Sequence, residues 1–129
     1  MGKMFARIKL NPFVLNRLTK AALIAAEQTA YAIRTDVEDA QVVPFAVGTL
    51  QNTSFVDSQE KSKGTFKLVY STPYARRLYW HPEYNFRTSE NANARGEWLE
   101  PWINGDKREF ARTSYRKLLA IQKRKAGIR

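Results

Sequence analysis

The chain has 129 residues, of which 43% are hydrophobic, and it carries a formal net charge of +10. This length and composition predict one folded domain over residues 1–129, with flexible ends at 1–10 and 124–129. The absence of cysteine excludes disulfides, a thiolate nucleophile and a Cys-based zinc site. No stretch has the pattern of a signal peptide or a membrane span, so we expect cytoplasmic synthesis and no membrane partner.

The first predicted element is a long helix from about Pro12 to about Glu38. Asn11 and Pro12 form an N-cap followed by proline at the first helical position, and the next helix-breaking residue is Pro44. Its predicted inner stripe consists mostly of small residues, which would let another element approach closely. The stripe comprises Leu15, Leu18, Ala22, Ala25, Thr29, Ala32 and Ile33.

The next segment has the pattern of β-structure. "LQNTSFVD" and "GTFKLVYS" are β-branched and aromatic runs separated by the polar "SQEKSK". We predict a hairpin with strands at about 51–56 and 65–71. Phe66, Leu68 and Tyr70 should share one face, because side chains alternate along a strand.

After the hairpin, Thr72-Pro73 repeats the cap-and-proline signal, which predicts a short helix from Tyr74 to about Trp80 that stops before Pro82. The polar stretch at 83–96 includes "SENANARG", which is rich in Asn, Ser and Gly. Such a composition lacks apolar anchors, so we expect this loop to be mobile in the isolated chain.

The last predicted element is a helix that follows Asp106, its expected N-cap, and ends at about Lys123. Its expected inner stripe is Phe110, Ser114, Leu118 and Ile121. Before it, a second group of apolar side chains should close one face of the sheet, namely Tyr74, Leu78, Tyr79, Trp98 and Trp102.

Together these elements predict an α+β fold. A long N-terminal helix and a C-terminal helix should pack on a small, mainly antiparallel sheet, with a short helix after the second strand.

Catalytic chemistry has little support in the residue types. His81 is the only histidine, so a catalytic triad would depend on it and a two-histidine metal site is excluded. Glu97 and Glu100 lie three residues apart in a polar stretch, which is typical of a solvated face. No glycine-rich phosphate-binding spacing occurs. We therefore expect no enzyme activity, no cofactor and no metal.

Sequence-independent nucleic-acid binding is the alternative that the composition favours. Aromatic residues alternate with arginines between Tyr74 and Arg87, and the chain ends in the basic "YRKLLAIQKRKAGIR". Rings could stack on bases and the cations could contact phosphates. However, Ala75, Leu78 and Tyr79 have the helical spacing of a buried seam, and no motif of a known nucleic-acid module is present.

Several spaced motifs, in one order, resemble a known family. "VPFAVGTLQNTSFVD", "STPYARRLYWHPEYNF" and "NANARGEWLEPWINGDKREFARTSYRKLL" are similar to segments of the minor capsid proteins of tailed phages, which are themselves similar to tail-completion proteins of the head–tail neck. The resemblance covers about Val43 to Leu119. One departure is Ala46-Val47, where the family often has Asp-Thr.

This resemblance implies a non-enzymatic virion protein, made in the bacterial host cytoplasm, that forms a ring at the head–tail junction, plausibly a hexamer. Its partners would be copies of itself and other neck, connector and tail proteins, with viral DNA passing nearby without specific binding. Rings use heterologous interfaces, in which one patch meets a different patch on the neighbour. The candidate interface residues are Pro44, Phe45, Val47, the acidic Asp36, Glu38 and Asp39, and the basic Arg76, Arg77, Arg112, Arg116, Lys123, Arg124 and Lys125.

Overall fold

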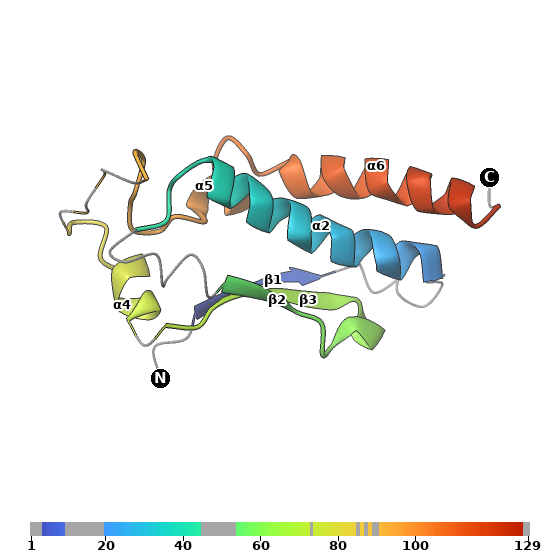
Figure 1. Cartoon of the computed structure of the whole chain (residues 1–129), viewed down its shortest axis with the longest axis horizontal. Helices are drawn as coiled ribbons and strands as arrows, with labels where there is room; N and C mark the ends of the chain where they lie inside the picture. The colour runs from blue at the N-terminus through green and yellow to red at the C-terminus, as the bar shows by residue number, and fades with distance from the viewer. Residues whose placement is uncertain are drawn as a thin grey trace.

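A three-stranded antiparallel sheet has the helices α2 and α6 stacked over one of its faces (Figure 1). The computed structural model describes residues 4–9, 20–44, 54–72, 74–84, 86, 88 and 91–127. Helix α2 lies between the sheet and α6, and the short helix α4 lies at one end of the sheet. The predicted α+β fold is confirmed.

The predicted hairpin is present as β2 (Ser54–Asp57) and β3 (Thr65–Tyr70). The two strands pair antiparallel, and a short 3-10 helix, η1 (Lys61–Lys63), makes the connection. Gly64 ends this connection with φ 71°, a left-handed conformation that glycine adopts without a steric penalty. Phe66, Leu68 and Tyr70 are buried as predicted, because they face the helices.

The N-terminal segment forms a third strand that the sequence analysis did not predict. β1 (Met4–Lys9) pairs antiparallel with β3, so the strand order is β1-β3-β2. Residues 1–10 were expected to be a flexible end, and for Met4–Lys9 this expectation is wrong. The segment alternates as a half-buried strand does: Ala6 and Ile8 pack on the core, while Phe5 and Arg7 are exposed.

The long predicted helix is α2 (Lys20–Asp39), and its C-terminal end agrees with the prediction. The first part of that prediction, including Leu15 and Leu18, lies outside the described residues. Ala26 and Ala30 pack on Phe66 of the sheet, and Gln28 accepts a hydrogen bond from Gln122 of α6 at 3.3 Å. Small side chains therefore let α2 contact a layer on each side.

The C-terminal helix α6 (Phe110–Lys125) begins later and ends later than predicted. Glu109, not Asp106, is its N-cap, and no side chain caps it. Ile121 is 38% exposed, so its expected place on the inner stripe is wrong. Gln122 is buried instead, because α6 packs along α2 and Gln122 faces that helix.

Trp98 is the centre of the aromatic core. It is fully buried, and its ring meets Tyr70 and Tyr79 edge-on at centroid distances of 5.4 and 4.8 Å. Trp102 is also buried, as predicted, and Leu78 packs against the same cluster. Tyr74 is 37% exposed, so its predicted place in this layer is wrong. It precedes the helix as its N-cap residue.

Helix α4 (Ala75–Tyr79) is the predicted short helix, and helix α5 (Glu100–Ile103) follows Trp98. The chain after α4 passes directly against Gly96. A Cβ atom at residue 96 would lie only 2.6 Å from Pro82 Cα, so this contact requires glycine.

Part of the loop that was expected to be mobile is bound to its own chain. The amides of Asn93 and Arg95 donate to the carbonyls of Gln41 and Val42 at 3.0 and 2.9 Å. The buried Asn91 side chain donates to the Val43 carbonyl at 2.8 Å. The expectation of a loop without anchors is therefore wrong for residues 91–95, because several of their polar groups form hydrogen bonds with the segment that follows α2.

Candidate protein interface

The rings of the α4 region are divided between the core and the surface. Tyr79 is buried against Trp98, whereas Trp80 is 61% exposed and Tyr84 is 40% exposed. Arg76 and Arg77, two of the candidate interface residues, are exposed on α4. Exposed Trp, Tyr and Arg are the residue types enriched at interaction hot spots, so this end of the molecule offers a contact surface.

His81 interacts with two side chains close to it in sequence, Glu83 and Tyr84. Its Nδ1 atom lies 2.7 Å from Glu83 Oε2, and its ring stacks on Tyr84 at 4.8 Å. The hydrogen bond from His81 holds the pKa of Glu83 below its ordinary value. Neither residue is buried.

Glu97 and Glu100 form a partly exposed polar face, and Glu100 accepts a hydrogen bond from Asn104 at 3.0 Å. Their carboxylates, together with burial as the larger cause, raise the pKa of Tyr79 to about 12. Within the described part of the chain, no group of three His, Cys, Asp or Glu side chains could hold a metal ion. The helices among the described residues are also too short or too polar to cross a membrane.

The acidic residues that are adjacent in sequence do not form one surface. Asp36 Oδ2 accepts a hydrogen bond from Trp102 Nε1 at 2.8 Å and lies 3.6 Å from Lys107 Nζ. Glu38 pairs with Arg34 at 3.6 Å. Asp36 therefore holds α5 against α2 while its side chain stays 28% exposed, and Asp39 is the exposed acid of this turn.

The segment after α2 also differs from the expected docking loop. Pro44 is buried, and the preceding carbonyls accept hydrogen bonds from residues 91–95, so Pro44 is unsuitable as an exposed docking residue. Phe45 and Val47 lie outside the described residues.

The exposed surface of α6 is basic, and we define its basic face by the exposed Arg112, Arg116, Lys117, Lys123, Arg124 and Lys125. Arg112, Arg116 and Lys123 lie on one side of the helix, and the other three lie around it. The basic face extends for about 20 Å, since an α-helix rises 1.5 Å per residue. Arg112 lies 3.6 Å from Glu109. The other five cations form no ion pair with any described residue. All five basic residues of α6 that the sequence analysis named as interface candidates are thus exposed on this helix, and Lys117 joins them.

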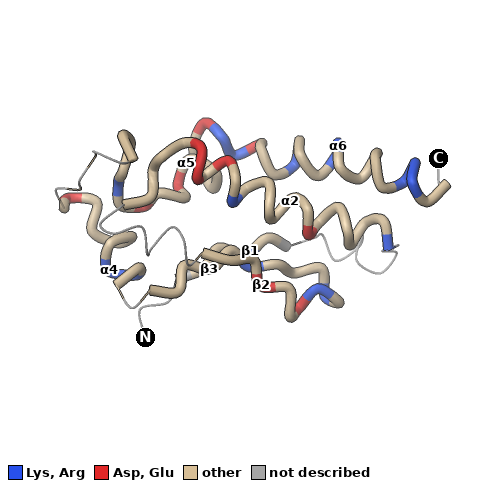
Figure 2. The backbone as a smooth tube through the Cα atoms, viewed as in Figure 1, with Lys and Arg blue, Asp and Glu red and all other residues tan. Residues whose placement is uncertain are grey.

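An acidic surface lies away from the C-terminal end of this basic face. We define it by Glu38 and Asp39 at the end of α2, Glu100 of α5, and Asp106 in the turn before α6. Figure 2 shows acidic residues gathered around α5 and the end of α2, while α6 carries mainly basic residues toward the C-terminus. The acidic surface and the C-terminal part of the basic face therefore lie on different parts of the molecule.

Sequence reasoning missed the contribution of Glu100 and Asp106 to this surface, because they join the end of α2 only through the tertiary fold. Comparisons with family models, with curated proteins and with solved structures gave no match to this chain.

Proposed function

We propose that this protein is a structural component of the head–tail connection of a tailed phage, of the minor capsid or tail-completion type, and that it forms a ring. The motifs between Val43 and Leu119 support the class of protein. The observation that carries the assembly proposal is the basic face of α6, where Arg112 is the one cation that forms an ion pair with a described residue.

A ring needs two different patches that complement each other on neighbouring subunits. The basic face and the acidic surface are of opposite sign and lie on different parts of the molecule. Contact between the two on neighbouring subunits would be attractive, whereas contact between two basic faces would be repulsive. The charge distribution therefore favours a head-to-tail arrangement over a symmetric pair that joins two basic faces.

Nucleic-acid binding is the second candidate, and the same basic face favours it. A helix with exposed cations along about 20 Å can follow a phosphate backbone, and each phosphate contact releases a counterion. The two proposals differ in what the basic face requires: an acidic protein surface in one case and any polyanion in the other.

The experiment compares two variants with the same change in net charge. Arg116→Glu with Lys123→Glu reverses two exposed residues of the basic face. Lys61→Glu with Lys63→Glu is the control, because both residues are exposed on η1, away from α6. Sedimentation at increasing concentration should show higher oligomers for the parent and the control but not for the α6 variant.

A rescue experiment tests the proposed pairing directly. Asp39→Lys with Asp106→Lys should also block assembly, and mixing this variant with the α6 variant should restore hetero-oligomers, because the reversed patches complement each other. The opposite result would be that the parent forms no oligomer, binds DNA with submicromolar affinity at about 150 mM salt, and loses this binding in the α6 variant. That result would contradict the ring proposal and support the nucleic-acid candidate.

A further inference from the structure

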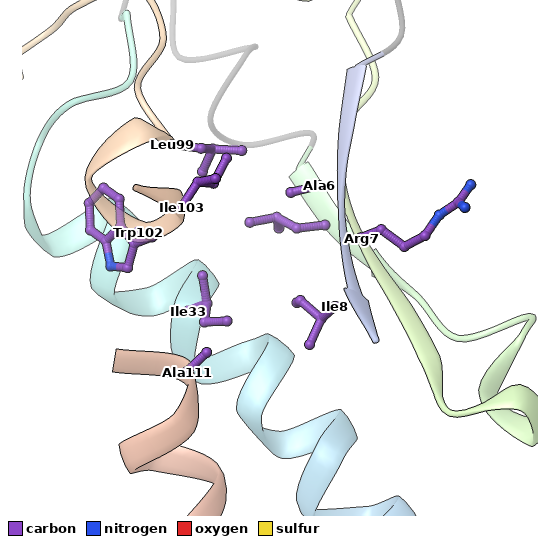
Figure 3. Close-up of a pocket in the computed structure, with 9 residues that line it drawn as sticks. Ala6, Arg7, Ile8, Ile33, Leu99, Trp102, Ile103 and Ala111 are labelled. Carbon is purple, nitrogen blue, oxygen red and sulfur yellow. The ribbon is translucent and has the colours of Figure 1, made fainter. Parts of the chain in front are cut away.

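An apolar pocket of about 310 Å³ lies between β1 and the α5 region. Figure 3 shows Leu99, Trp102 and Ile103 on one side of it and Ala6 and Ile8 of β1 on the other, with Ile33 and Ala111 also lining it. Two of these residues are alanines, so the space results from small side chains at facing positions. Trp102 Nε1 is already bonded to Asp36, and Figure 3 shows the guanidinium of Arg7, the other polar residue of the lining, pointing away from the pocket. Neither group is therefore placed to orient a small polar ligand inside it.

The pocket borders a strand edge that has no partner strand among the described residues. β1 is an edge strand of the sheet, and its backbone hydrogen bonds within the described residues go to β3 alone. An edge strand presents a row of free N–H and C=O groups that can pair with another extended chain. The polar groups beside this apolar pocket are therefore those of a strand edge, and they fit a polypeptide backbone.

The charges of the sheet indicate what such a chain would carry. On the exposed face of the sheet, Lys67 of β3 has two cross-strand neighbours. It lies opposite Arg7 of β1 and opposite Asp57 of β2. Like charges directly opposite each other destabilise a sheet. Lys67 is partly compensated by Glu60 at 3.1 Å, but Arg7 forms no ion pair with any residue that the structure describes. An acidic residue placed beside Arg7 on the free edge would be favoured.

We propose that β1 and this pocket form a docking site for an extended segment of another protein, which adds as a fourth strand beside β1. The added segment carries an acidic residue beside Arg7 on the exposed face. In the added segment, the residues on either side of this acidic residue point to the opposite face of the sheet. One of them is a large apolar side chain that enters the pocket beside Ala6 and Ile8. Backbone pairing supplies affinity, and the pocket supplies specificity, as in other cases of strand addition. This proposal does not depend on ring formation.

The test uses the whole chain and a displayed library of random ten-residue peptides. The peptides selected should alternate apolar and polar residues, with an acidic residue next to a large apolar one. In the complex, amide hydrogen exchange of Phe5 to Ile8 should slow, because the free edge of β1 becomes paired.

Three variants locate the site. Ala111→Phe fills the pocket. Ile103→Ser removes an apolar side chain that is 51% exposed, so the Ile103→Ser variant should fold as the parent does. Each should weaken binding of a selected peptide by about tenfold or more, the loss typical of a main anchor contact. Ala120→Phe places the same ring on the exposed side of α6 and should leave binding unchanged.

The proposal is overturned if selection yields no peptide, if bound peptides leave β1 exchange unchanged, or if Ile103→Ser and Ala111→Phe bind them as well as the parent does. Concentration-dependent dimers that bury the β1 edge and exclude every peptide would also overturn it, because the occupant would then be a second copy of this chain.

Discussion

Asp36 provides a direct test of how α5 is held against α2. Its carboxylate accepts the Trp102 indole N–H at 2.8 Å and lies 3.6 Å from the Lys107 ammonium group. A hydrogen bond to a charged group contributes about 1.5–3 kcal/mol to stability. The Lys107 pair adds little, about 0–1 kcal/mol, because both side chains are partly exposed to solvent. Asp36→Ala should therefore lower the free energy of unfolding by about 2 kcal/mol.

The measurement is urea denaturation of Asp36→Ala beside Asp39→Ala, which removes an exposed acid from the same turn of α2. The control should change stability by no more than about 0.5 kcal/mol. Adding Trp102→Phe to each protein completes a double-mutant cycle, and we expect an Asp36–Trp102 coupling of about 1–2 kcal/mol. Equal stability of the two alanine variants, or a coupling near zero, would show that Asp36 does not hold Trp102.

Three further outcomes follow from the core, the anchored loop and the buried hydroxyl. Trp98→Ala should lower the free energy of unfolding by about 3–5 kcal/mol, because it empties a fully buried site between two rings; a thermal midpoint close to that of the parent would contradict this. In the isolated chain, the amides of Asn93 and Arg95 should exchange more slowly than that of Ala92, whose 3.4 Å contact to a side-chain oxygen is exposed, and rapid exchange at all three would show that the loop is unanchored. Burial raises the pKa of Tyr79 from 10.0 to about 12, so the stability it contributes is complete below pH 10 and declines as the pH rises toward 12. Alkaline denaturation curves should show a smaller decline in this window for Tyr79→Phe, and curves that remain parallel would contradict the assignment.

The alternation of side chains and the helix signals determined much of this fold. Phe66, Leu68 and Tyr70 identify the inner face of β3, since the two-residue period of a strand is a local property. The end of α2 and the position of α4 follow likewise from local helix formers and prolines. The predicted Thr72 cap is wrong, because Tyr74 is the N-cap residue of α4 and no side chain caps that helix. The basic face of α6 was also accessible to sequence analysis, because helical geometry alone places Arg112, Arg116 and Lys123 on one side.

Pairing between distant segments was decided only by the tertiary structure. The six-residue β1 is short, and only its pairing with β3 distinguishes it from an irregular end. Asp36 looked like a surface charge until the fold placed Trp102, 66 residues further along, at hydrogen-bond distance. The polar loop likewise has partners only in the tertiary structure, where the backbone amide of Asn93 donates a hydrogen bond to the carbonyl of Gln41. Composition indicates which groups seek water or a partner, but which partner a polar group finds depends on long-range packing, which no local pattern encodes.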